Sequence, residues 1–192
     1  MSRLHRRAVV RELLEDRGEL LVVAGLGAPA WDITAAGDHP LSFPMWGAMG
    51  GAAMIGLGLA LAQPKRKVLV VTGDGEMLMG LGSLATVGAQ QPPNLTIVVL
   101  DNGLYGETGM QRSHTSLGTR LADVARGCGI GHAVEVRALE EAEVLARRAA
   151  DRAGPAFAQV HVRGDELPRV LPPRDGAFLK NRLRRTLGLG PL

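Results

Sequence analysis

Five short stretches of mostly apolar, often β-branched residues alternate along the chain with longer stretches in which apolar residues recur at helical spacing. In the short stretches most positions are apolar, rather than every second one, which predicts strands buried on both faces. The expected strands cover residues 19–25, 67–73, 94–102, 132–137 and 155–163. Strands that alternate with helices form a parallel sheet with helices on both faces, because right-handed crossovers place them there. The sequence therefore predicts an α/β fold, a three-layer αβα sandwich with a central parallel sheet.

The segments between these strands carry the expected helices and loops. Helices are expected at 3–17, 48–62, 76–90, 119–129 and 139–151, with a short one near 30–36. Two segments are expected to be loops, 38–47 because of its prolines and 103–118 because of its polar residues. A chain of 192 residues fits one domain. We place this domain at residues 1–170, followed by a basic tail at 171–192.

Basic side chains concentrate at the end of that tail, where residues 179–192 contain no acid. The cations there are Lys180, Arg182, Arg184 and Arg185. A basic segment can meet nucleic acid or an acidic partner. Aromatic residues, on which bases would stack, make up only 3% of the chain. A solvated helix face or a subunit contact is therefore the favoured interpretation, and no nucleic-acid partner is expected.

Other features of the composition restrict where the protein is expected to work. The first residues are charged throughout and lack the apolar core of a signal peptide. No run of about 18 apolar residues is present, so no membrane contact is expected. Cys128 is the only cysteine, which allows no disulfide within the chain. These features favour a cytoplasmic location.

Polar residues interrupt the apolar pattern where two of the expected strands end. Gly73-Asp74-Gly75 ends one strand and Asp101-Asn102-Gly103 ends the next, with 26 residues between Gly75 and Asn102. Ligands of open parallel sheets bind beyond the carboxyl ends of the strands. Carboxylate and amide oxygens suit Mg²⁺, and glycine lets a phosphate approach the backbone closely. Either motif alone is a common turn, but the pair at this spacing predicts a metal–diphosphate site.

With these motifs the chain resembles thiamine-diphosphate-dependent enzymes, in which Gly-Asp-Gly is followed after 25 to 30 residues by Asn. The segments "FPMWGAMGGAAMIGLGLALA", "GDGEMLMGLGSLATVG" and "NLTIVVLDNGLYGETGMQ" are similar to the diphosphate-binding domain of 2-oxo acid decarboxylases. The resemblance covers residues 5–165. It is nearest to sulfopyruvate decarboxylase β subunits and to the C-terminal part of phosphonopyruvate decarboxylases.

The resemblance implies roles for individual residues. Asp74 and Asn102 would bind Mg²⁺ through their side chains, and Leu104 through its carbonyl oxygen. Gly75, Glu76, Tyr105 and Gly106 would surround the diphosphate. Gly73, Asp74, Asn102 and Leu104 are further residues expected to bind the cofactor. The Glu76 carboxylate cannot face a phosphate, so only its N–H is expected to contribute.

The "GAMG" stretch would hold the aminopyrimidine ring of the cofactor. Met49 would be the apolar wedge that bends the cofactor, and the carbonyl of Gly47 would accept a hydrogen bond from its amino group. Core packing is the ordinary role of a methionine in a helix, but Met49 precedes Asp74 by 25 residues, which favours the wedge.

The polar segment that leaves the metal site can reach a substrate. Glu107 and His114 are the candidate catalytic residues in it, beside Thr108, Gln111 and Arg112. Arg112 or His114 could pair with an anionic group of a small 2-oxo acid. A solvated loop without a role in catalysis is the alternative for each of them.

The resemblance covers only one of the two domains that form the active site in this family. In the family, a Glu from a pyrimidine domain activates the cofactor, and this chain has sequence for one such domain only. The resemblance thus implies a separate α subunit that supplies the Glu, in an α2β2 assembly. A decarboxylase β subunit is the main hypothesis. The alternatives are a subunit of an acetolactate-synthase-like carboligase and a cofactor-binding module without turnover.

Overall fold

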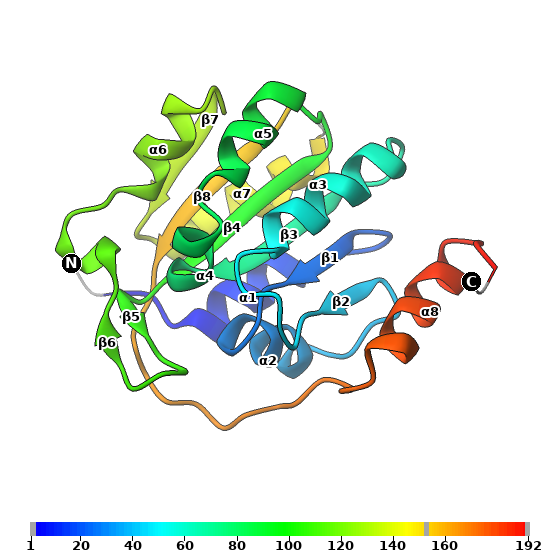
Figure 1. The fold of residues 1–192 in the computed structure, drawn as a ribbon, viewed down its shortest axis with the longest axis horizontal. Helices are drawn as coiled ribbons and strands as arrows, with labels where there is room; N and C mark the ends of the chain where they lie inside the picture. Colours follow the sequence, from blue (N-terminus) through cyan, green and yellow to red (C-terminus); the bar gives the residue numbers. More distant parts are fainter. Residues whose placement is uncertain (1–2, 152–153, 191–192) are drawn as a thin grey trace.

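The computed structural model describes residues 3–151 and 154–190 (Figure 1). Residues 1–2 and 152–153 of the predicted domain and residues 191–192 of the predicted tail lie outside the described residues. The core of the fold is a six-stranded sheet in the order β2-β1-β3-β4-β8-β7. All of its neighbouring strands are parallel. The strands are β1 (Leu21–Ala24), β2 (Ser42–Pro44), β3 (Val68–Gly73), β4 (Leu95–Asp101), β7 (His132–Val136) and β8 (Ala156–His161).

Helices cover both faces of this sheet, so the predicted three-layer αβα sandwich is confirmed (Figure 1). One face packs against α1 (Arg6–Leu14), α2 (Ala28–Ala35) and α7 (Leu139–Asp151). The other face packs against α3 (Ala52–Ala62), α4 (Asp74–Met79), α5 (Ser83–Gln90) and α6 (Leu121–Gly127).

The strands alternate their side chains between these two layers. In β3, Leu69 and Val71 pack in the layer of α1, whereas Val68 and Val70 pack in the layer of α3. All four are buried completely. This explains why the strand is apolar at consecutive positions, and each such side chain contributes about 1.5–3 kcal/mol to folding.

The first helix is shorter than the predicted 3–17, because the residues before it pair with the sheet. The amide of Leu4 donates to the carbonyl of His161, and the amide of Arg163 donates to the carbonyl of Leu4. Leu4 therefore forms a parallel bridge with Val162, and α1 begins only at Arg6. This pairing brings the N-terminal segment to the carboxyl end of β8.

The single helix predicted at 76–90 is two helices, α4 and α5, with a turn at residues 80–82. Gly80 lies against the backbone of Gly50, and a Cβ atom on Gly80 would be 2.2 Å from the carbonyl oxygen of Gly50. The preceding Ala48 and Gly50 have φ angles of 54° and 91°. These values are outside the helical range, so α3 begins at Ala52 and not at the predicted residue 48.

The predicted loops contain short strands. β2 lies within 38–47 at the edge of the sheet and pairs only with β1 among the described strands. A proline is tolerated at its end because an edge strand has no neighbour on its outer side to which a backbone N–H would donate. Within 103–118, β5 (Leu104–Tyr105) pairs antiparallel with β6 (Gln111–Arg112), and a 3₁₀ helix, η1, covers His114–Leu117. The long segment 103–118 is therefore a small hairpin and a helical turn.

The predicted tail contains a helix that packs onto the domain. Helix α8 (Gly176–Thr186) packs beside β2, and Leu179 and Leu183 are buried there. Arg182 forms an ion pair with Asp38 at 2.6 Å. Within residues 3–151 and 154–190, no helix has the length and apolar character needed to cross a membrane.

Candidate active site

A cavity opens at the point where the strand order of the sheet reverses. From β1 the chain moves to β2 on one side, and from β3 it moves to β4 on the other. The carboxyl ends of β1, β3 and β4 thus meet at a crevice, the usual ligand site of such sheets. Residues that follow each of these strands line the cavity, among them Leu26, Asp74 and Asn102.

Asp74 is 2% exposed and follows the last residue of β3. Its Oδ2 accepts hydrogen bonds from the hydroxyl of Ser113 and, at 3.3 Å, from that of Thr115. Burial raises the pKa of Asp74, the hydrogen bond from Ser113 opposes this, and the neighbouring Asp101 raises the pKa further. No cationic side chain pairs with Asp74 among the described residues. The carboxylate is therefore held in place but not neutralised.

Asn102 is held in a turn at the end of β4. Its Oδ1 accepts from the amide of Leu104 at 2.8 Å, and Gly103 has a φ angle of 76°, which favours glycine. The guanidinium of Arg3 donates to the carbonyl of Asn102 at 2.5 Å. Asn102 and Leu104 line the same cavity as Asp74, as the predicted spacing of one crossover requires.

Glu76 is a buried residue of the cavity lining, and its side chain connects three elements. Its carboxylate accepts from the amide of Leu26 at 3.1 Å, from the amide of Ala52 at 3.2 Å and from the hydroxyl of Thr72 at 2.9 Å. Burial raises the pKa of Glu76, and these hydrogen bonds oppose the increase. Gly25 leaves room for the carboxylate, because a Cβ atom there would lie 1.9 Å from Oε2. The side chain thus connects the end of β1, the start of α3 and β3.

Met49, Gly75 and Tyr105 form one wall of the cavity. A Cβ atom on Gly75 would lie 2.7 Å from the ring of Tyr105 and 3.6 Å from the terminal methyl of Met49. Met49 is 40% exposed, so it does not pack in the core. The glycine therefore allows an aromatic ring and an apolar side chain to approach the backbone beside Asp74.

The charge of the cavity indicates what could enter it. Asp74, Glu76 and Glu107 line it, whereas Arg6 is the one basic side chain among its described lining residues. Arg6 is itself paired with Asp32 at 2.5 Å. A diphosphate would be repelled here unless a cation accompanied it.

The described residues contain no group of three His, Cys, Asp or Glu side chains suited to a metal ion. The donors on hand are instead Asp74, Asn102 and backbone carbonyls, which are oxygen ligands that leave positions for phosphate oxygens and fit a diphosphate-bound Mg²⁺.

The residues predicted as a site line this cavity together, except for Gly47, Gln111, Arg112 and His114. The guanidinium of Arg112 donates to Ser116, and the side chain of Gln111 bonds to Thr108. Gly47 is exposed in the turn before Met49. His114 lies in a neighbouring groove with Met49, Met79 and Tyr105, and its Nδ1 is 3.2 Å from the hydroxyl of Tyr105. The two predicted catalytic residues are thus in different hollows, because Glu107 lines the cavity and His114 lines the groove.

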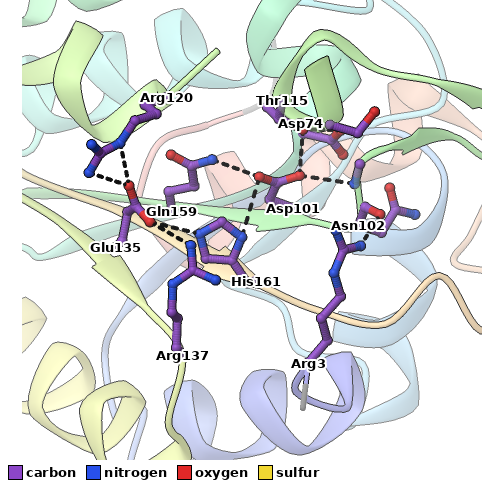
Figure 2. A network of polar contacts seen from close by, with 12 residues as sticks. Arg3, Asp74, Asp101, Asn102, Thr115, Arg120, Glu135, Arg137, Gln159 and His161 are labelled. Carbon is purple, nitrogen blue, oxygen red and sulfur yellow. Dashed lines mark hydrogen bonds and ion pairs between the residues drawn. The ribbon is translucent and has the colours of Figure 1, made fainter. Parts of the chain in front are cut away.

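Sequence reasoning missed the buried polar side chains that support the site. Ser113 and Thr115 contact Asp74. Asp101 contacts Thr115 and Gln159 (Figure 2). Signals existed for two of them, since Asp101 ends an apolar strand and Gln159 interrupts another. Ser113 and Thr115 flank His114 in a polar segment, where nothing in the sequence distinguishes them from solvated residues.

Comparison with known proteins adds a family match. Residues 30–160 match the family model described as thiamine pyrophosphate enzyme, C-terminal TPP binding domain. Over 136 residues the chain is 41% identical to the sulfopyruvate decarboxylase subunit beta of Methanocaldococcus jannaschii, covering 70% of this chain and 71% of that protein.

Two further comparisons involve longer proteins. The chain is 39% identical over 170 residues to the phosphonopyruvate decarboxylase of Streptomyces viridochromogenes, covering 86% of this chain and 42% of that enzyme. The solved structure of benzoylformate decarboxylase from Polynucleobacter necessarius has a TM-score of 0.69 at 19% identity. That match covers 86% of this chain and 34% of the solved chain, and at this identity it shows the fold alone. The chain thus spans less than half the length of both proteins.

Proposed function

Because the chain belongs to the thiamine pyrophosphate enzymes and carries their C-terminal TPP binding domain, we propose that it is the β-type subunit of a decarboxylase dependent on thiamine diphosphate and Mg²⁺. The substrate is a small anionic 2-oxo acid. The relatives named as decarboxylases of sulfopyruvate and phosphonopyruvate support this reaction and substrate class. We propose a cytoplasmic location, because a chain with one cysteine forms no internal disulfide and so does not depend on an oxidising compartment.

The observation that carries the proposal is the excess of acidic side chains around the cavity at the switch point. In this proposal a Mg²⁺ ion bound by Asp74, Asn102 and the carbonyl of Leu104 compensates that charge. The backbone of Gly73, Gly75, Glu76 and Gly106 would hold the diphosphate beside this ion.

Met49, Tyr105 and the carbonyl of Gly47 would hold the organic part of the cofactor. When bound, thiamine diphosphate supplies the nucleophilic carbon and the electron sink that loss of CO₂ requires. This chain contributes binding and orientation. Of the described residues that line the groove beside Met49, His114 is the one with an imidazole, a side chain that can pair with an anion and transfer a proton. We assign to His114 the pairing with an anionic substrate group and proton transfer at the product carbon, and to Glu107 a polar contact at the cavity.

The active site is completed by a partner in this proposal. The cavity and the groove are open to solvent, and Met49 and Met79 are 40% and 68% exposed at their rim. An α subunit with a pyrimidine domain would cover this apolar rim and supply the activating Glu, in an α2β2 assembly. The exposed side of α8 is a further candidate for subunit contact.

The test is co-expression with the gene of a pyrimidine-type domain encoded next to this one, followed by a panel of 2-oxo acids with thiamine diphosphate and Mg²⁺. We expect release of CO₂ and an aldehyde from 3-sulfo- or 3-phosphono-substituted pyruvate, with neither chain active alone. Formation of a C–C bond instead would identify the carboligase alternative. Cofactor binding without turnover in the complex would identify a binding module.

A further inference from the structure

Asp101, the last residue of β4, occupies the centre of a buried polar network beside the metal site (Figure 2). It is 3% exposed, and both of its carboxylate oxygens accept hydrogen bonds. Oδ1 accepts from the amide of Gly103 at 2.9 Å and from the hydroxyl of Thr115 at 2.7 Å, and Oδ2 accepts from the amide of Gln159 at 2.6 Å. Protein donors therefore occupy both oxygens of the carboxylate.

These donors belong to segments that carry the proposed metal ligands. Gly103 lies between Asn102 and Leu104, so its bond to Asp101 fixes the turn that presents both of them. The hydroxyl of Thr115 is also 3.3 Å from Oδ2 of Asp74. Asp101 thus holds the ligands at the end of β4 directly, and contacts the ligand at the end of β3 through Thr115.

The orientation of Gln159 is fixed as well. Its Oε1 accepts from the amide of Ala122 at 3.2 Å, so its Nε2 must point toward Asp101. Nearby, His161 lies 3.8 Å from Oδ2 of Asp101 and 3.1 Å from Glu135. The side of Asp101 away from the cavity is therefore anchored to β8.

From this arrangement we infer that Asp101 is a positioning residue that sets the spacing between the oxygens of Asp74 and Asn102 and does not itself bind the metal. The inference rests on the proposed Mg²⁺–diphosphate site. Partners that orient metal ligands are typically worth 10–100-fold in metal affinity, because the ligands otherwise lose their preorganised geometry.

The substitution Asp101→Asn tests this directly. An asparagine replaces one oxygen with an NH₂ group, which must face either the amide of Gly103 or the fixed amide of Gln159. Both of these are donors, so at least one hydrogen bond is lost in each orientation. We expect Mn²⁺ affinity, measured by EPR on the co-expressed complex with saturating thiamine diphosphate, to fall about 10–100-fold.

A compensating variant separates positioning from charge. In Asp101→Asn/Gln159→Glu, the NH₂ group of residue 101 can donate to the carboxylate at residue 159, which still accepts from Ala122. Oδ1 of residue 101 keeps its bonds to Gly103 and Thr115. We expect the double variant to recover most of the lost Mn²⁺ affinity. If residue 101 had to bind the metal as a carboxylate, the double variant would bind as weakly as Asp101→Asn, and the inference would be overturned.

A second pair of variants decides the question should Asp101→Asn fail to fold. Thr115→Val removes the hydroxyl that joins Asp101 to Asp74 and is expected to weaken Mn²⁺ binding about 10-fold, whereas Thr115→Ser keeps the hydroxyl and is expected to bind like the wild type. Ser116→Ala is the matched control, since among the described residues that hydroxyl bonds to Ser113 and Arg112 and to neither Asp74 nor Asp101. Equal affinity in Thr115→Val and Thr115→Ser would overturn the inference.

The wild-type chain distinguishes this inference from the proposed function. If it binds Mn²⁺ with thiamine diphosphate and Asp101→Asn binds equally well, the positioning role is wrong and the metal site remains. If the wild type does not bind Mn²⁺ under these conditions, the proposed metal site fails and the inference fails with it.

Discussion

Replacing Asp74 with asparagine should change the stability of the protein in opposite directions with and without its ligands. In the free chain, the Asp74 carboxylate is buried beside the carboxylate of Asp101, and burial raises its pKa. Its hydrogen-bond partners among the described residues are the hydroxyls of Ser113 and Thr115, with no basic side chain. An asparagine keeps an acceptor for these hydroxyls and removes the buried charge. The ligand-free variant should therefore be more stable than the wild type at neutral pH.

The size of the two effects can be compared. Removal of an unfavourable buried charge is worth about 0.5–2 kcal/mol, within the usual range of stabilising substitutions. For a domain of this size, each kcal/mol raises Tm by about 2–4 °C. Ligand binding stabilises the wild type by about 2.7 kcal/mol when the free ligand is at 100 times its Kd. The wild type should then become the more stable protein by roughly 1–2 kcal/mol, because the variant has lost its metal ligand.

Thermal unfolding followed by circular dichroism measures both situations, first with EDTA and then with Mg²⁺ and thiamine diphosphate. Asp123→Asn is a suitable control, since Asp123 pairs with Arg120 and Arg126 at the surface. That control should differ little from the wild type in either condition. The reasoning is refuted if Asp74→Asn shows the same ligand-dependent increase in Tm as the wild type.

Three further substitutions test the structure around the site. Glu76→Gln should lower the free energy of unfolding by about 1–3 kcal/mol in urea denaturation, because its NH₂ group would face a buried donor; unchanged stability would contradict this. Gly80→Ala should destabilise by a similar 1–3 kcal/mol because of the contact with Gly50, whereas Gly58→Ala, which meets no atom within 4 Å, should stabilise α3 by up to about 1 kcal/mol. Equal changes in the free energy of unfolding for Gly80→Ala and Gly58→Ala would argue against the close contact between Gly80 and Gly50. Hydrogen bonds from Arg137, His161 and Arg120 outweigh the effect of burial and lower the pKa of Glu135 from 4.5 to about 2. The ionised Glu135 therefore contributes its full stabilisation above about pH 4.5, and this contribution is lost as the pH falls toward about 2. Glu135→Gln should make the free energy of unfolding depend less on pH in this range. An unchanged pH dependence would contradict the assignment.

Much of the fold could be predicted because its strands are apolar at consecutive positions. A strand such as β4, which is buried on both faces, has a continuous apolar sequence that identifies it as a central strand. The helices between the strands follow from the spacing of the strands. Edge elements were not predictable in this way. β2 is three residues long and ends in proline, and its pairing with β1 is a tertiary contact with no local signal. The break between α4 and α5 likewise depends on the backbone of Gly50, which lies far from Gly80 in sequence.

The candidate site shows the same division. Asp74 and Asn102 could be brought together from sequence, because one crossover places the ends of adjacent parallel strands side by side. For Glu76 the sequence predicts a carboxylate that does not face a phosphate, and in the structure this carboxylate accepts hydrogen bonds from Leu26, Ala52 and Thr72. The contacts of Ser113 and Thr115 with Asp74 could not be predicted, since they depend on how a 16-residue polar segment (103–118) folds back over the strand ends. The roles of Glu107 and His114 in catalysis stay predictions.

The most direct test of the account is an anomalous difference map of the protein crystallised with Mn²⁺ and thiamine diphosphate, collected at the manganese edge. The account predicts a single strong peak about 2.0–2.4 Å from side-chain oxygens of Asp74 and Asn102, with diphosphate oxygens on its open side. A manganese ion bound elsewhere, or a diphosphate seated in the cavity with no metal beside Asp74, would contradict it.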